Sequence, residues 1–230
     1  MTATTTLATR LAEVRARIAQ ACDRAGRDPA EVLLVGVSKT QPAEAVRDAV
    51  AAGLLDLGEN RAQDVLEQAA AASAAGLAPR WHFIGHLQRN KVREVLPVIH
   101  SLHSMDSLRL IEEIEQRWEA RGAAGPLPCF LEVNIAGEEQ KSGVEPADLP
   151  TLLAAASKSP ALLVEGLMTV APQVSDPEQT RPVFRALRDL AAAHGLCGLS
   201  MGMTEDYPVA IEEGATIVRV GRAIFGERRG

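Results

Sequence analysis

Lys39 has both the side chain and the position that could support chemistry. It follows the apolar run 32–37, which predicts a buried strand. A lysine at the carboxyl end of such a strand can present its amine to a partly dry site, where loss of water favours the neutral, nucleophilic form. Taken alone, Lys39 fits a solvated strand-end lysine better, because charged groups are seldom buried. The rest of the sequence decides between these interpretations.

The elements that must position Lys39 form a regular alternation. Eight short apolar runs predict strands at 32–38, 55–58, 81–84, 99–102, 129–134, 162–167, 197–200 and 216–220. Helical patterns lie between them at 43–52, 61–75, 107–121, 146–157, 177–194 and 206–213. A further amphipathic helix is predicted over 7–26.

Strands separated by helices pair in parallel through right-handed crossovers. Eight such units predict an α/β fold, a closed (β/α)8 TIM barrel, as one domain over residues 1–230 with an extra N-terminal helix. An open doubly wound sheet is the alternative, because the second and fourth strands are weakly marked. In a barrel, chemistry gathers at the carboxyl ends of the strands, and phosphate often binds after strands 7 and 8.

Two segments at those predicted positions could hold an anion. Strand 7 runs into Ser200-Met201-Gly202-Met203-Thr204, and strand 8 runs into Arg219-Val220-Gly221-Arg222. Each offers a glycine turn before a helical segment, where backbone N–H groups can face a phosphate. Ordinary turn and capping chemistry is the competing interpretation of each segment.

Arg219 interrupts an apolar strand, so it must find a partner or line a polar cavity. An ion pair with Glu132 or Glu165 is one solution. The other is a ligand site shared with Lys39, since strands 1 and 8 are neighbours in a closed barrel. A ligand with both an aldehyde and a phosphate suits these groups, and pyridoxal 5'-phosphate has both.

Composition limits the other function classes. The formal net charge of −6 argues against a nucleic-acid partner, because phosphate neutralisation needs a concentrated excess of Lys and Arg. No apolar run is long enough to cross a bilayer and no secretion signal is visible, so we expect a cytoplasmic protein without a membrane partner. Three scattered cysteines fit reduced packing residues. The histidines lack metal-ligand spacing, so we expect no metal.

The motifs of the chain, taken together, resemble those of the pyridoxal phosphate homeostasis protein family. The most specific is Trp-His-Phe-Ile-Gly-His-Leu-Gln-Arg-Asn-Lys at 81–91. Gly-Val-Ser-Lys at 36–39, Gly-Glu-Asn at 58–60, Ser-Met-Gly-Met at 200–203 and Arg-Val-Gly at 219–221 also resemble family blocks, in the same order. The barrel of this family is similar to the N-terminal domain of alanine racemase, a pyridoxal phosphate fold of type III.

The resemblance implies a pyridoxal phosphate-binding protein that carries the cofactor as a Schiff base on Lys39. It implies a monomer that acts in vitamin B6 homeostasis and amino-acid and keto-acid balance, with pyridoxal phosphate-dependent apo-enzymes as partners and no assigned catalytic residue. By the same resemblance we expect the phosphate to bind to Ser200, Gly202 and Gly221, and Arg219 to face the pyridine nitrogen. Asn60 should lie near the cofactor, and the pocket should be lined by His82 and Met203.

Two other function classes remain open. The first is a pyridoxal phosphate-dependent racemase, although Arg219 would weaken the ring as an electron sink and we expect no second acid-base face. The second is a phosphosugar-type enzyme that uses Lys39 as a Schiff-base residue without a cofactor. Lys141, on a glycine-containing loop after strand 5, is a candidate second amine for pyridoxal phosphate.

Overall fold

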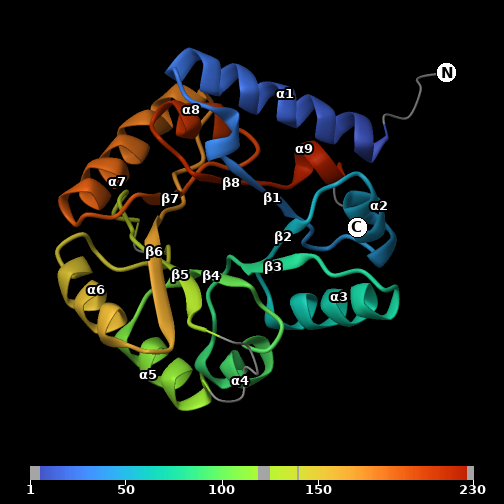
Figure 1. Ribbon diagram of the computed structural model, residues 1–230. Coiled ribbons are helices and arrows are strands. Elements are labelled where there is room, and N and C mark those ends of the chain that lie inside the picture. Colours follow the sequence, from blue (N-terminus) through green and yellow to red (C-terminus); the bar gives the residue numbers. More distant parts are fainter. Residues whose placement is uncertain (1–5, 119–124, 139, 227–230) are drawn as a thin grey trace.

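The computed structural model describes residues 6–118, 125–138 and 140–226, and its strands form one closed barrel (Figure 1). All eight neighbouring pairs are parallel, in the order β1 to β8. The strands are β1 (Leu33–Val37), β2 (Asp56–Glu59), β3 (Arg80–Phe83), β4 (Ser101–Met105), β5 (Leu127–Glu132), β6 (Leu162–Met168), β7 (Gly198–Ser200) and β8 (Ile217–Val220). This confirms the predicted (β/α)8 barrel and excludes the open sheet.

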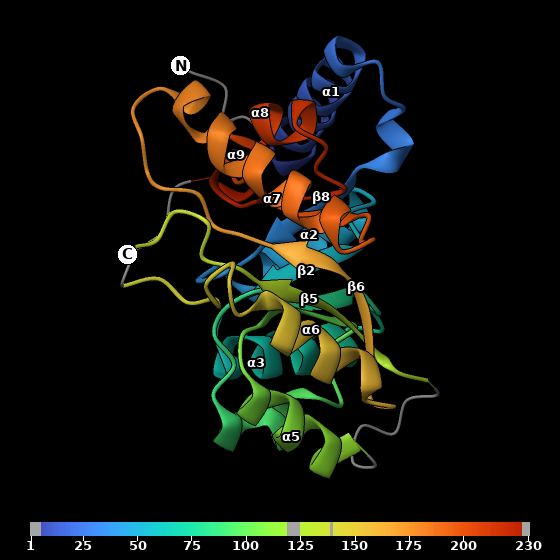
Figure 2. The same ribbon diagram turned by 90° about the vertical axis from the view of Figure 1, so that its left-hand side faces the viewer.

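Helices surround the strands, as the side view in Figure 2 shows. The α-helices are α1 (Leu7–Ala25), α2 (Ala43–Ala51), α3 (Ala62–Ala74), α4 (Val92–Val95), α5 (Leu108–Arg117), α6 (Leu149–Lys158), α7 (Arg181–Ala193), α8 (Tyr207–Glu212) and α9 (Arg222–Phe225). The 3-10 turns are η1 (Pro29–Glu31), η2 (Arg89–Lys91) and η4 (Pro177–Thr180). Residues 119–121 of the helix predicted at 107–121 lie outside the described residues.

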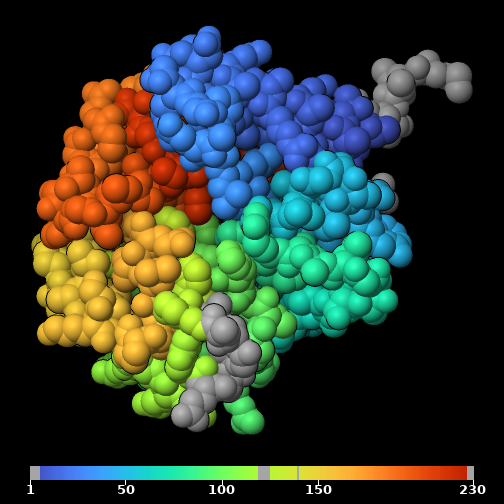
Figure 3. All heavy atoms as spheres, in the orientation of Figure 1, coloured from blue at the N-terminus to red at the C-terminus, as the bar shows by residue number. Residues whose placement is uncertain are grey.

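The N-terminal helix α1 packs outside the barrel against the last units of the chain. Thr6 caps its first turn, and Gly26 ends it with a left-handed φ of 64°. Its buried face, which includes Leu11, Val14 and Ile18, contacts the α8 and α9 region. In Figure 3 the blue atoms of this helix lie directly against the orange and red atoms of the C-terminal part. Burial of this apolar stripe therefore supports the two elements that follow β7 and β8.

Strand β1 closes the barrel by pairing with β8. Val35 lies opposite Arg219, and Gly36 lies opposite Val220. Side chains alternate along a strand, so Val35 and Arg219 both point inward, and Val35 packs with Phe130 in the small core inside the barrel. The same alternation directs Lys39, two residues after Val37, toward the open end of the interior.

Strand β4 begins two residues later and ends three residues later than the predicted run 99–102, and β5 begins two residues before the predicted 129–134. The reason for the shift in β4 is that its inward positions are polar. His103 and Ser101 are buried inside the barrel, so apolarity does not mark the strand. Register shifts on both sides of β5 add to the difference.

Candidate functional site

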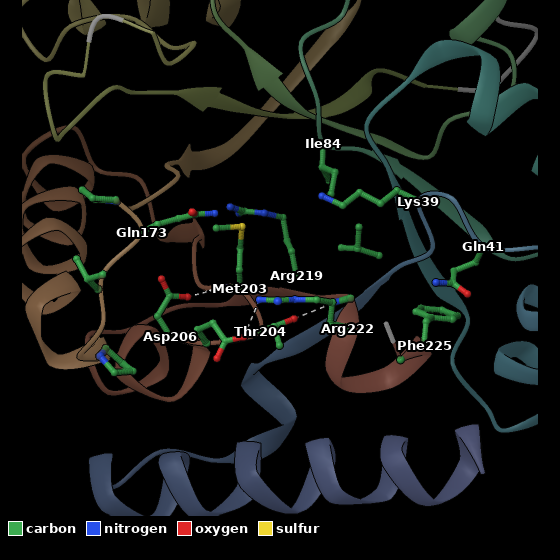
Figure 4. Close-up of a pocket in the computed structure, with 17 residues that line it drawn as sticks. Lys39, Gln41, Ile84, Gln173, Met203, Thr204, Asp206, Arg219, Arg222 and Phe225 are labelled. Carbon is green, nitrogen blue, oxygen red and sulfur yellow. Dashed lines mark hydrogen bonds and ion pairs between the residues drawn. The ribbon is translucent and has the colours of Figure 1, made fainter. Parts of the chain in front are cut away.

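A cavity of about 710 Å³ opens at the mouth of the barrel, the ring of loops that follow the carboxyl ends of the strands (Figure 4). Lys39 and Arg219 line it from neighbouring strands, and their side chains project into the same space. Its other lining residues are Val37, Gln41, Ile84, Pro172, Gln173, Val174, Pro177, Met203, Thr204, Glu205, Asp206, Gly221, Arg222, Phe225 and Gly226. Segments after β1, β3, β6, β7 and β8 thus contribute to one site.

A tight turn directly after β1 presents Lys39. The Gln41 N–H donates to the Ser38 carbonyl at 2.9 Å, and Thr40 adopts a left-handed φ of 63°. This φ is an unusual conformation for a β-branched residue, and it costs roughly 1–2 kcal/mol. The Ser38 hydroxyl anchors the base of the turn by donating to Glu59 Oε1 at 2.7 Å, and both side chains are fully buried. The surrounding structure therefore holds the strained turn, and with it Lys39.

Arg219 is 3% exposed and is held by groups inside the barrel. Its Nη1 donates to the Ser200 hydroxyl at 2.7 Å, and its Nη2 donates to the Thr169 carbonyl at 2.9 Å. Burial lowers the pKa of Arg219 to about 10, while the charges of Glu132 and Asp206 raise it, so it remains a cation at neutral pH. Within the described residues no carboxylate forms an ion pair with Arg219, so the structure favours the interpretation that it faces a polar cavity.

The loops after β7 and β8 meet at one edge of the cavity. The Gly221 N–H donates to the Thr204 hydroxyl at 3.2 Å, and Arg222 and Glu205 form an ion pair of 2.8 Å at the exposed rim. The helices α8 and α9 that follow are short, so their dipoles are weak. Candidate anion ligands at this edge are therefore individual groups: the Thr204 hydroxyl, the Arg222 guanidinium and backbone N–H groups.

The structure brings together four of the eight residues predicted for the site. Lys39, Met203, Arg219 and Gly221 line the cavity. Gly202 is buried immediately behind it, and its carbonyl accepts from the Arg219 N–H at 3.0 Å. Ser200 is fully buried beneath the cavity, where its hydroxyl bonds Arg219 and His103. The predicted phosphate contact of Ser200 stays a prediction, and its hydroxyl is already engaged by these two side chains.

His82 and Asn60 lie away from the lining residues. His82 is buried inside the barrel, with Nε2 at 3.0 Å from Asp56 Oδ1 and Nδ1 at 3.0 Å from His103 Nε2. Asn60 is half-buried after β2, and its backbone packs so tightly on Gly85 that a Cβ on Gly85 would clash with the Asn60 carbonyl oxygen. This close approach explains why the motif at 81–91 needs glycine at position 85.

Sequence reasoning missed two groups near the site. Asp206 lines the cavity, and its Oδ1 accepts from the Met203 N–H at 2.6 Å. Burial raises its pKa, while that hydrogen bond lowers it. The second group is His103, whose Nδ1 lies 2.8 Å from the Ser200 hydroxyl beneath the cavity. Its contact with Ser200 joins residues 97 positions apart, for which the chain carries no local signal. No metal-binding group of three or more His, Cys, Asp or Glu side chains occurs in the described ranges.

Lys141 lies beside the mouth of the barrel but outside the set of lining residues. Its amine forms an ion pair of 2.7 Å with Glu138 and donates to the Val170 carbonyl at 3.3 Å. Val170 lies two residues before Pro172, where the segment that lines the cavity begins. Lys141 therefore contacts the segment that leads from β6 to the cavity lining.

Helices capable of crossing a membrane, as judged by length and apolarity, do not occur in the described part of the chain.

A family model described as "Alanine racemase, N-terminal domain" matches residues 9–229. That match spans every strand of the barrel and the whole of the cavity lining.

Relatives of known family match nearly the full chain. It is 43% identical over 226 residues to the pyridoxal phosphate homeostasis protein of Aquifex aeolicus, covering 96% of this chain and 97% of that protein. It is 44% identical over 225 residues to the protein of the same name from Pseudomonas aeruginosa, covering 97% of this chain and 96% of that protein.

A solved structure of lower sequence identity has the same fold. PipY of Synechococcus elongatus, described with pyridoxal phosphate bound, superposes with a TM-score of 0.82 at 33% identity, covering 96% of this chain and 100% of that one. The identities, the coverage and the matched family model agree. The chain belongs to the pyridoxal phosphate homeostasis protein family, which has the barrel of the alanine racemase N-terminal domain.

Proposed function

We propose that this chain binds pyridoxal 5'-phosphate as a Schiff base with Lys39 and serves vitamin B6 homeostasis and amino-acid and keto-acid balance by holding and releasing the cofactor. The observation that carries the proposal is the convergence of Lys39 and Arg219 on one cavity of about 710 Å³. A volume in this range is typical of sites for small organic ligands. The names of the relatives support the same cofactor.

The donor groups of the cavity fit the two ends of pyridoxal phosphate. Lys39 supplies an amine for the aldehyde, and Arg219 supplies a fixed guanidinium for the pyridine nitrogen. At the edge where the loops after β7 and β8 meet, Thr204, Arg222 and the backbone at Gly221 would hold the phosphate, with the Gly221 N–H exchanging its present bond to the Thr204 hydroxyl for one to the phosphate. A charge-assisted contact from Arg222 is the strongest of these.

The arginine also explains why we propose binding without robust turnover. When bound in enzymes, pyridoxal phosphate acts as an electron sink, most strongly when a carboxylate keeps the ring nitrogen protonated. Arg219 remains a cation and only donates hydrogen bonds, so it disfavours a proton on that nitrogen. The residues of this site therefore orient the ring and leave the sink weak.

The cavity reaches the surface, as a protein that releases its cofactor requires. Its rim residues Glu205 and Arg222 have side chains 70% and 55% exposed. We propose that the protein acts as a monomer and that pyridoxal phosphate-dependent apo-enzymes are recipients. A defined apo-enzyme that regains activity on mixing with the loaded protein, faster than free cofactor in solution accounts for, would test this role.

The first experiment is the visible spectrum of the protein loaded with pyridoxal phosphate, followed by borohydride reduction and peptide mapping. A Schiff-base band with the pyridoxyl mass on Lys39, lost in Lys39→Ala, is the expected result. Lys91→Ala is a matched control, because Lys91 is a partly exposed lysine paired with Glu94 away from the cavity. A colourless protein that cannot be loaded would contradict the proposal and favour the cofactor-free Schiff-base enzyme.

A racemase-type activity is the second candidate, because the matched family model describes the alanine racemase N-terminal domain. It predicts exchange of the amino-acid α-hydrogen with solvent deuterium and interconversion of enantiomers, both abolished in Lys39→Ala. Binding without either reaction in the loaded protein would leave the carrier role as the function of the site.

A further inference from the structure

A chain of buried hydrogen bonds crosses the barrel beneath the cavity. It starts at Arg219, whose Nη1 is 2.7 Å from Ser200 Oγ. Ser200 Oγ is 2.8 Å from His103 Nδ1, and His103 Nε2 is 3.0 Å from His82 Nδ1. His82 Nε2 is 3.0 Å from Asp56 Oδ1. None of the five side chains is more than 8% exposed.

The chemistry of its two ends gives the chain one direction. Arg219 can only donate, so the Ser200 oxygen accepts from it. At the other end, hydrogen bonds from His82 and Arg80 outweigh burial and lower the pKa of Asp56 to about 2, so its carboxylate only accepts. Hydrogens assigned from these partners run from Ser200 to His103, from His103 to His82 and from His82 to Asp56, with one proton on each imidazole.

The reverse direction is less favourable. A proton on both nitrogens of His82 would force His103 to donate to Ser200, whose oxygen already accepts from Arg219. The Ser200 hydroxyl hydrogen would then lose its acceptor in a fully buried place, which costs about 1–3 kcal/mol. Burial also lowers the pKa of His103 well below its usual value, in agreement with a neutral ring.

The chain therefore links a cation at the cavity with an anion near the opposite end of the barrel. Asp56 is the first residue of β2 and forms a bidentate pair with Arg80, at 2.7 and 2.6 Å. Hydrogen bonds that run in one direction polarise each other and strengthen the bond at the end of the series. Since Arg219 Nη2 is held by the Thr169 carbonyl, a firm bond at Nη1 fixes the plane of the guanidinium.

We propose that Ser200, His103, His82 and Asp56 are positioning residues that hold the Arg219 guanidinium in place for the pyridine nitrogen of the bound cofactor. The proposal rests on the proposed function, and none of these four residues lines the cavity. Two other charged groups face Arg219, namely Glu132 and Asp206. They act through space, whereas the chain acts through the orientation of the guanidinium.

The test compares pyridoxal phosphate with its 1-deaza analogue, in which a carbon replaces the ring nitrogen. A positioning role acts only through that nitrogen, so a variant in the chain should weaken binding of pyridoxal phosphate and leave the analogue unaffected. His103→Gln removes the acceptor for Ser200, while His103→Asn can keep an amide oxygen near the place of Nδ1. His194→Gln, in a histidine at the end of α7, is the control.

We expect His103→Gln to raise the Kd for pyridoxal phosphate about 10-fold, the effect of one charge-assisted hydrogen bond, and the Kd for the analogue less than twofold. His103→Asn should restore most of the lost affinity for pyridoxal phosphate, and His194→Gln should bind both ligands with the affinities of the unaltered protein. Equal weakening of both ligands, or no weakening of either, would overturn the proposal. If the unaltered protein bound neither ligand, the proposed function itself would fail.

Asp56→Asn provides a second variant if His103→Gln does not fold. It keeps an oxygen for His82 but removes the negative charge at the end of the chain. We expect the Kd for pyridoxal phosphate to rise about threefold and the Kd for the analogue to stay unchanged. The effect is smaller because it must pass through three further hydrogen bonds to reach Arg219. Unchanged affinity for pyridoxal phosphate would remove Asp56 from the set of positioning residues.

Discussion

The backbone at Gly221 approaches the Val37 carbonyl oxygen so closely that a Cβ on Gly221 would lie 3.3 Å from it. This contact joins the loop after β8 to the end of β1, the strand that leads to Lys39. The proposed phosphate edge and the Lys39 turn are therefore mechanically coupled at the point where the barrel closes.

Gly221→Ala should weaken phosphate binding without unfolding the protein. Gly221 has φ −107° and ψ −84°, a negative φ just outside the right-handed helical region, so alanine should lower the free energy of unfolding by only about 1 kcal/mol. The added methyl group displaces the loop by a few tenths of an ångström, and we expect the Kd for pyridoxal phosphate to rise about 10-fold. Titration with pyridoxal, which lacks the phosphate, is the control. Equal losses for both ligands would place Gly221 away from the phosphate.

Gly202→Ala should instead destabilise the fold. Gly202 has a left-handed φ of 90°, and a Cβ there would lie 2.6 Å from the Ala210 Cβ. The strained backbone and the overpacking together should lower the free energy of unfolding, measured with urea, by about 3 kcal/mol. Gly26→Ala is the matched control. Gly26 has a left-handed φ of 64°, but a Cβ there would meet no atom within 4 Å, so the free energy of unfolding should fall by only about 1 kcal/mol. Similar losses in both variants would argue against the clash.

The convergence of Lys39 and Arg219 was predictable because it follows from topology. Eight strand-and-helix units imply a closed barrel, and closure makes the first and last strands neighbours. The register of Val35 with Arg219 then places the arginine inside the barrel. The apolar patterns of the strands and the closure of the barrel were therefore sufficient to predict that Lys39 and Arg219 lie together.

The groups beneath the cavity were not predictable in the same way. His103 and Ser200 meet across the barrel interior, and their contact depends on side-chain direction in strands whose ends the apolar pattern misplaced. A buried histidine that satisfies another polar group has the same local sequence as a solvated one. The phosphate role of Ser200 and the pocket-lining role of His82 follow from the family resemblance and stay predictions. The hydrogen-bonded chain that joins these two residues has no signal in the sequence.

Glu59→Gln should change how stability depends on pH. Burial raises the pKa of Glu59 to about 7 from a reference of 4.5, although the Ser38 hydrogen bond lowers it. Between these values the folded state binds more protons than the unfolded state, so Glu59 makes stability fall as pH rises. Glutamine does not titrate. Between pH 5 and pH 8 the unfolding free energy of the unaltered protein should therefore fall by about 2–3 kcal/mol relative to that of Glu59→Gln.

Urea unfolding of both proteins at several pH values measures this shift. Glu115→Gln, at an exposed position on α5, is the control and should leave the pH dependence unchanged. Parallel profiles for Glu59→Gln and the unaltered protein would show that the Glu59 carboxyl titrates alike in both states.

Lys141→Ala tests whether a second amine takes part in holding the cofactor. Lys141 donates to the Val170 carbonyl beside the cavity and is paired with Glu138, so its amine is positioned near the mouth of the barrel. In Lys39→Ala loaded with pyridoxal phosphate, we expect borohydride to attach part of the pyridoxyl label to Lys141. The double variant Lys39→Ala/Lys141→Ala should lose that label.

Lys39→Ala/Lys91→Ala is the matched control, because it removes a more exposed lysine that is likewise in an ion pair with a glutamate three residues away. Peptide mapping of the reduced proteins gives the distribution of label among all lysines. Random surface modification predicts that both double variants retain the label equally, whereas a second holding site predicts a loss in the Lys141 variant alone. Labelling that is unchanged by Lys141→Ala would assign the Lys141 amine a purely structural role, as the link between the loop after β5 and the end of β6.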